Sequence, residues 1–115
     1  MSEVRSLNIK TGVVKRLSKD REQYIKDEKA QRLKVEKMEN DKADFYDIKQ
    51  QKEVLKEDRV MIEDSHKRLE AAVQDLTNLL SVYPEEGDED LTKAIIEAKT
   101  ALQKAQVAIG STISD

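Results

Sequence analysis

The side chains best suited to acid–base chemistry or metal binding lie close together near the middle of the chain. His66 is the only histidine in the 115-residue sequence, and Glu63 and Asp64 precede it. Imidazole and carboxylate groups can transfer protons or bind divalent cations when a fold gathers them around one site. The sequence has no cysteine to add a thiolate, and its three glycines are scattered rather than grouped in a phosphate-binding loop. We therefore predict that the protein is not an enzyme and requires neither a metal nor another cofactor.

Basic side chains that could contact nucleic-acid phosphates are concentrated in the N-terminal part of the chain, at Lys15, Arg16, Lys19, Arg21 and Lys26. Acidic residues are interleaved with them, and the net charge of the whole chain is −3. The opposing charges largely cancel, so this pattern is more typical of a solvated helix face with pairs four residues apart. The sequence therefore argues against nucleic acid as a partner.

A strict seven-residue apolar repeat runs through the second half of the sequence. Its members are Ile48, Leu55, Ile62, Leu69, Leu76 and Tyr83. A period of seven keeps one narrow seam of a helix facing a partner helix. Neither Gly nor Pro interrupts residues 48–82, so this segment is predicted to be one long helix that must pack against other helices. His66 falls on the second line of this seam, where a half-buried structural histidine is expected.

Breaks in the apolar spacing divide the chain into three predicted helices. They span about residues 8–41, with a possible later start at residue 12, then about 47–82 and about 89–110. Asp44 or Asp47 can cap the second helix and Asp88 or Asp90 the third, while Pro84–Gly87 is the clearest break. Short connectors make successive helices antiparallel, so residues 1–115 are predicted to form a single all-α domain. Its expected architecture is an up-down-up three-helix bundle with spectrin-like, left-handed coiled-coil packing.

The antiparallel arrangement predicts which residues meet. With a turn centred near residues 43 and 44, Glu28 of the first helix should face Arg59 of the second. The third helix is shorter, so three helices meet at only one end, where we expect the most buried residues: Leu17, Leu69, Val73, Leu76, Ile95 and Leu102. The remaining two-helix hairpin is expected to leave Val35, Met38 and Leu55 partly unburied. A monomer is favoured slightly over a homodimer, since polar residues interrupt that stripe.

Several strings in the sequence are specific enough to compare with known proteins. They are IKTGVVKRL at residues 9–17, EKM at 36–38, YDIKQQ at 46–51 and RLEAAVQDL at 68–76. In this order and spacing, they resemble the tubulin-binding cofactor A family, also called tubulin-specific chaperone A. The first and third strings are the specific ones, because any coiled coil could supply EKM or RLEAA.

The resemblance implies a small three-helix chaperone that captures β-tubulin folding intermediates after the chaperonin. Such proteins pass their client toward assembly of the αβ-tubulin heterodimer, without nucleotide hydrolysis. Other tubulin-folding cofactors are further implied partners, and the implied location is cytoplasmic and cytoskeleton-associated. The sequence itself agrees with the cytosol, having no signal-peptide core and no apolar run long enough to span a membrane. The alternative is a structural coiled-coil adaptor, or a helical subunit of an unrelated complex.

The resemblance also suggests where the client binds. β-Tubulin is an acidic client in that family, so the basic excess of the first helix is the preferred contact surface. The candidate client-binding residues are Lys15, Lys19, Lys26 and Lys29. The second choice is the outer face of the second helix, around Glu53, Glu57 and Lys67.

Overall fold

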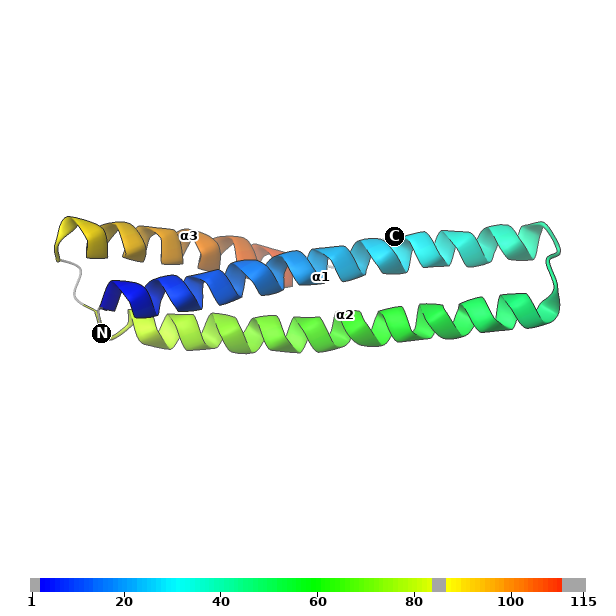
Figure 1. Ribbon diagram of the computed structural model, residues 1–115, viewed down its shortest axis with the longest axis horizontal. Helices are drawn as coiled ribbons and strands as arrows, with labels where there is room; N and C mark the ends of the chain where they lie inside the picture. The colour runs from blue at the N-terminus through cyan, green and yellow to red at the C-terminus, as the bar shows by residue number, and fades with distance from the viewer. Residues whose placement is uncertain (1–2, 84–86, 111–115) are drawn as a thin grey trace.

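Three antiparallel helices form an elongated rod with Cα dimensions of 64 × 23 × 17 Å (Figure 1). The computed structural model describes residues 3–83 and 87–110. In that part of the chain α1 spans Glu3–Asn40, α2 spans Phe45–Leu80 and α3 spans Glu89–Gly110. The predicted all-α, up-down-up three-helix bundle is thus confirmed. α3 lies beside the N-terminal half of α1, and the rest of the rod is a hairpin of α1 and α2 (Figure 1).

The helix ends follow local capping interactions. α1 begins at Glu3, before the predicted start at residue 8 or 12, and runs through Gly12, although glycine is a weak helix former. α2 begins at Phe45 rather than near residue 47, because the Asp44 carboxylate accepts the Tyr46 N–H at 2.8 Å. Asp88 caps α3 in the same way, accepting the Leu91 N–H at 2.8 Å. The predicted break at Pro84–Glu86 lies outside the described residues.

The turn between α1 and α2 is a compact helix C-cap. Lys42 has a φ of 55°, and its N–H donates to the Glu39 carbonyl at 3.2 Å. The Ala43 N–H reaches back to the Met38 carbonyl at 2.9 Å. These two bonds form a Schellman motif, which satisfies the last carbonyls of α1 and reverses the chain direction within a few residues. The short reversal is what makes α2 antiparallel to α1.

The main core lies at the end of the rod where all three helices meet. Leu7 and Val14 of α1 and Leu69 and Leu76 of α2 are fully buried there. α3 packs onto them mainly with small or leucine side chains, namely Leu91, Ala94, Ala98, Ala101, Leu102 and Ala105. Alanine lets helix backbones approach closely, so this face of α3 fits against the α1–α2 pair without large side chains.

The predicted core list is partly correct. Leu69, Leu76 and Leu102 are buried, as expected, but Leu17, Val73 and Ile95 are only half-buried. For Ile95 the reason is the rotation of α3. Ala94, Ala98, Ala101 and Ala105 share the face turned to the other two helices, and this places Ile95 at the edge of the contact.

The two-helix half of the rod is better packed than predicted. Val35 and Leu55 are only 5% and 8% exposed, so the expectation that they remain unburied is wrong. Met38 is half-buried. Polar groups also take part in the contact between the two helices. Gln31, for example, donates to both the backbone and side-chain oxygens of Gln51 at 2.9 Å.

The predicted register between α1 and α2 is confirmed by an ion pair between buried Glu28 and exposed Arg59. The Arg59 Nε atom lies 3.5 Å from the Glu28 Oε1 atom. Exposed ion pairs Lys10–Asp75 and Glu39–Lys52 join the same two helices on either side of it. Pairs on both sides of Glu28 show that one antiparallel register holds along the whole hairpin.

The uneven coverage by α3 predicts uneven sensitivity to mutation. Leu69→Ala or Leu76→Ala should lower the free energy of unfolding by about 2 to 5 kcal/mol, because each leaves a cavity among three helices. Val54→Ala, at a site exposed on the hairpin half, should cost much less. Urea denaturation measures both effects, and equal losses at the two kinds of site would contradict the position of the core.

Candidate functional site

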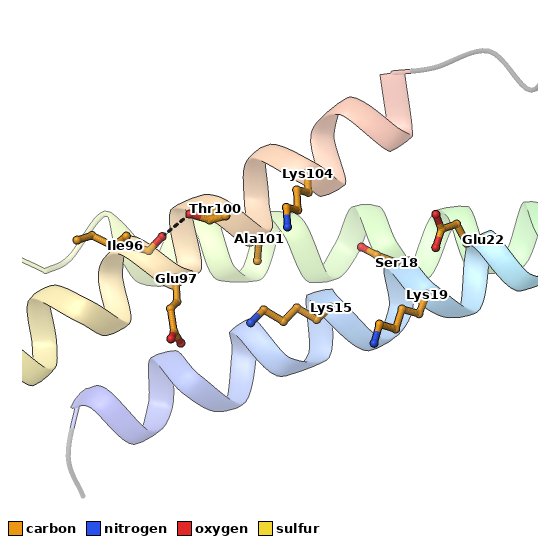
Figure 2. Close-up of a pocket in the computed structure, with 9 residues that line it drawn as sticks. All are labelled: Lys15, Ser18, Lys19, Glu22, Ile96, Glu97, Thr100, Ala101 and Lys104. Atoms are coloured by element: carbon orange, nitrogen blue, oxygen red, sulfur yellow. Dashed lines mark hydrogen bonds between the residues drawn. The ribbon is translucent and has the colours of Figure 1, made fainter.

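A groove between α1 and α3 lies at the predicted basic surface (Figure 2). This α1–α3 groove has a volume of about 520 Å³. Its lining residues are Lys15, Ser18, Lys19, Glu22, Ile96, Glu97, Thr100, Ala101 and Lys104. Three lysines against two glutamates give it a small basic excess.

Helical spacing explains how these side chains come together. Lys15, Ser18, Lys19 and Glu22 are three or four residues apart and therefore share one face of α1. The α3 residues follow the same rule, and Figure 2 shows Glu97, Ala101 and Lys104 pointing from α3 toward α1. The Thr100 hydroxyl donates to the Ile96 carbonyl at 2.9 Å, within its own helix.

The chemistry of the α1–α3 groove suits a peptide-like ligand with mixed character. Lys15, Lys19 and Lys104 offer ammonium groups to carboxylates. Ile96 is 59% exposed and, with Ala101, offers apolar surface at the α3 side. A groove of this composition can hold a segment of protein that carries both acidic and apolar side chains.

The structure separates the four predicted client-binding lysines into two pairs. Lys15 and Lys19 line the α1–α3 groove. Lys26 and Lys29 lie on the same face of α1, judged by helical spacing, but they are exposed and do not line the groove. Lys104 and Ile96 on α3 were missed. The four-residue spacing of Ile96, Thr100 and Lys104 indicates that they share one face of α3. Only the packing of the helices shows that this face lies opposite Lys15.

Part of the second predicted surface, on the outer face of α2, lies at a depression. Glu53 and Glu57 line a shallow depression with Val60 and Met61. Val60 is 59% exposed, so an apolar side chain lies between the charges. Lys67 does not join this depression and instead lines a separate hollow near the end of α3.

A polar layer crosses the seam between α1 and α2. Glu28 is only 8% exposed, and its carboxylate lies 3.5 Å from the Nε atoms of both Arg32 and Arg59. Asp58 is half-buried beside this layer. Burial raises the pKa of Asp58, and the negative charges of Asp27, Glu28 and Glu57 raise it further. The layer thus combines one compensated carboxylate with another that is disfavoured in its charged form.

No metal site or membrane segment is found in the described part of the chain. No group of three or more His, Asp or Glu side chains is placed there to hold a metal ion. His66 is half-buried on α2, with its Nε2 atom 3.1 Å from a Glu70 carboxylate oxygen. Among these residues, no helix is long and apolar enough to cross a membrane.

A rod of three packed helices with a mixed polar and apolar groove is an architecture typical of small helical proteins that bind other proteins. Comparison with known proteins is more specific. The profile of the family described as tubulin binding cofactor A matches residues 2–102. The chain belongs to this family.

Individual relatives agree over most of their length. Human tubulin-specific chaperone A is 48% identical over 91 residues, which cover 79% of this chain and 80% of the human protein. The crystal structure of tubulin folding cofactor A from Arabidopsis thaliana has 38% identity and a TM-score of 0.81, covering 91% of this chain and 96% of that chain. RBL2P, a β-tubulin-binding post-chaperonin cofactor, has 30% identity and a TM-score of 0.80, covering 92% and 99%.

The raised pKa of Asp58 leads to a prediction about stability and pH. A carboxyl group whose pKa is higher in the folded state favours folding when protonated, and that contribution is lost as pH rises through the folded pKa. Asp58→Asn should therefore increase the free energy of unfolding at pH 7. The gain should disappear below the ordinary pKa of 3.8, where Asp58 is protonated in both states.

Urea denaturation of both proteins at pH 7 and at about pH 3 measures this difference. Asp20→Asn, at an exposed position on α1, is the matched control and should change stability little at either pH. A gain for Asp58→Asn that is equal at the two pH values would show that charge at Asp58 is not its cause.

Proposed function

We propose that the protein is a tubulin-folding chaperone that captures β-tubulin folding intermediates after the chaperonin. It then passes them toward assembly of the αβ-tubulin heterodimer, without hydrolysing nucleotide. The observation that carries this proposal is the family match across residues 2–102. It is supported by the names of the relatives, which describe a tubulin-specific chaperone and a β-tubulin-binding post-chaperonin cofactor.

The shape of the molecule suits a client that is not fully folded. A 64 Å rod offers long helical faces on which an incompletely folded chain can bind without one fixed docking geometry. We place the client along these faces rather than at the turns. The basic face of α1 is the preferred contact, because Lys15, Lys19, Lys26 and Lys29 follow one line along the helix and β-tubulin is an acidic client. The α1–α3 groove would receive part of that client beside Lys15 and Lys19.

The proposal includes the setting in which the protein works. It would act in the cytoplasm, in association with the cytoskeleton, where its other partners would be further tubulin-folding cofactors. It would act as a monomer, because burial of Val35 and Leu55 within the hairpin leaves no continuous apolar seam for a second copy. Sedimentation equilibrium that shows a dimer at all concentrations would contradict the proposed monomeric state.

One binding experiment separates this function from that of a structural coiled-coil adaptor. Immobilised protein is incubated with quasi-native β-tubulin and, separately, with the assembled αβ-tubulin dimer. A chaperone of this pathway should retain the free β-subunit and not the dimer. Failure to retain β-tubulin would reject the proposed function and favour the adaptor.

The basic face of α1 yields a more specific prediction. Reversing Lys15, Lys19, Lys26 and Lys29 together to Glu should weaken β-tubulin capture by about tenfold or more, because attraction becomes repulsion. Helicity and thermal melting should change little, since these four side chains are exposed. Added salt should also weaken the wild-type complex, because the Debye length is only about 8 Å at physiological ionic strength.

The matched control reverses four other exposed lysines, Lys34, Lys42, Lys49 and Lys99. It has the same change in net charge but leaves the basic face of α1 intact, so it should capture β-tubulin far better than the first variant. If the first variant folds and captures β-tubulin normally, contact is not on this face. The outer face of α2, with Glu53, Glu57, Val60 and Met61, then becomes the site to test.

A further inference from the structure

Arg21 is a buried charge with no hydrogen-bond or ion-pair partner among the described residues. It occupies the α1 seam and is only 5% exposed. No hydrogen bond or ion pair joins it to any residue that the structure describes, and its Nε atom is buried without an acceptor. A guanidinium cannot escape this situation by losing its proton, because it stays charged at all ordinary pH values. Its burial therefore opposes folding.

The contrast with Glu28 shows that the seam can hold a charge at lower cost. Glu28 lies seven residues further along the same seam and is nearly as buried, but Arg32 and Arg59 both lie 3.5 Å from its carboxylate. A buried charge that loses its partner is strongly destabilising, whereas an apolar residue of similar size is often neutral or stabilising. An apolar residue of similar length, such as Met, should therefore stabilise the fold at least as well as Arg21 does.

Arg21 lines a hollow of about 500 Å³, called here the Arg21 hollow. Its other lining residues are Arg59, Ile62, Glu63, His66, Lys67, Glu70 and Ile109. Ile109 belongs to the last turn of α3, so the hollow lies where the three-helix half of the rod gives way to the hairpin (Figure 1). The hollow therefore lies beside both the buried guanidinium and the last described turn of α3.

The chain's own carboxylates at the hollow do not neutralise Arg21. Glu70 is paired with His66 at 3.1 Å, and neither Glu63 nor Glu70 forms an ion pair with Arg21. Counted with Arg21, Arg59 and Lys67, these two glutamates leave the hollow with one excess positive charge, which matches a singly charged anion better than phosphate. Ile62 and Ile109 add apolar walls. A single carboxylate on an aliphatic stem fits this combination, because it can pair with a guanidinium through two parallel hydrogen bonds.

We propose that the Arg21 hollow binds an acidic side chain of the protein client, with Arg21 as its buried anchor. This inference rests on the proposed function, since it names one recognition site for the β-tubulin intermediate. It is distinct from the basic face of α1, because Arg21 is a seam residue rather than an exposed one. The client would supply a partner that Arg21 lacks among the described residues, so binding would relieve an unfavourable burial in the free protein.

The test uses the full chain with three substitutions, each measured for melting temperature and for β-tubulin capture. Arg21→Met removes the charge but keeps an apolar stem of similar length. Arg21→Lys keeps the charge but loses the planar fork. Arg16→Met, at an exposed position on the same helix, is the control with the same change in charge and composition.

Arg21→Met should raise the melting temperature of the free protein by about 4 °C or more, because an uncompensated buried charge is removed. The same variant should weaken β-tubulin capture by about tenfold or more. Arg21→Lys should retain part of the capture, and Arg16→Met should resemble the wild type in both measurements. A variant that is more stable yet binds less well is not expected if Arg21 has only a structural role.

Two outcomes would overturn this site while leaving the proposed function intact. In the first, the wild-type protein captures β-tubulin and the Arg21→Met variant captures it equally well. In the second, the Arg21→Met variant melts at a lower temperature than the wild type, which would show that Arg21 stabilises the fold. Wild-type protein that fails to capture β-tubulin would instead reject the proposed function, and the Arg21 site with it.

Discussion

The seam between α1 and α2 is the constraint on which the rest of the structure depends. Every seventh residue of α1 from Leu7 to Val35 is buried, and α2 repeats the same interval from Leu55 to Leu76. This period holds one stripe of each helix against the other over the length of the hairpin. Because the seam occupies so narrow a stripe, most of each helix surface remains available for charged side chains. α3 then packs onto one end of a scaffold that is already formed by the other two helices.

Charge placed within this seam has two different consequences. At Glu28 two arginines lie beside the buried carboxylate, and the pair with Arg59 agrees with the observed alignment of the helices. At Arg21, one heptad earlier, no such compensation exists among the described residues. Position along the seam alone cannot explain the difference, since both residues are buried. What differs is the neighbourhood, because Arg21 lines the Arg21 hollow next to the last described turn of α3.

Much of this fold follows directly from the sequence. The seven-residue period predicts the seam of α2, and the short connectors predict the antiparallel bundle, because both depend on local rules. The burial of Ile95 is one feature that such local rules do not predict. Its spacing places it on an apolar stripe, but the rotation of α3 against two other helices is set by close packing of alanines. Burial of Val35 and Leu55 likewise depends on how tightly two seams fit, which a count of nearby helices does not reveal.

The candidate site was only partly predictable for the same reason. Helical spacing places Lys15 and Lys19 on one face of α1, but it does not show that Lys104 of α3 meets them across a groove. α3 spans Glu89–Gly110, and the Arg21 hollow beside its last described turn appears only once the helices are packed. Residues that act through contact between helices are therefore the ones that a single sequence least readily reveals.

The limited length of α3 also divides the rod into two regions that differ in how readily they open. Backbone amides around Leu69 and Leu76 lie among three helices, so their hydrogen bonds break only when the main core separates. Amides near the turn at Lys42 have only one neighbouring helix and lie close to the exposed rings of Phe45 and Tyr46. Their hydrogens can exchange with solvent through fraying of the hairpin tip alone. One end of the molecule can therefore loosen repeatedly while the other end stays folded.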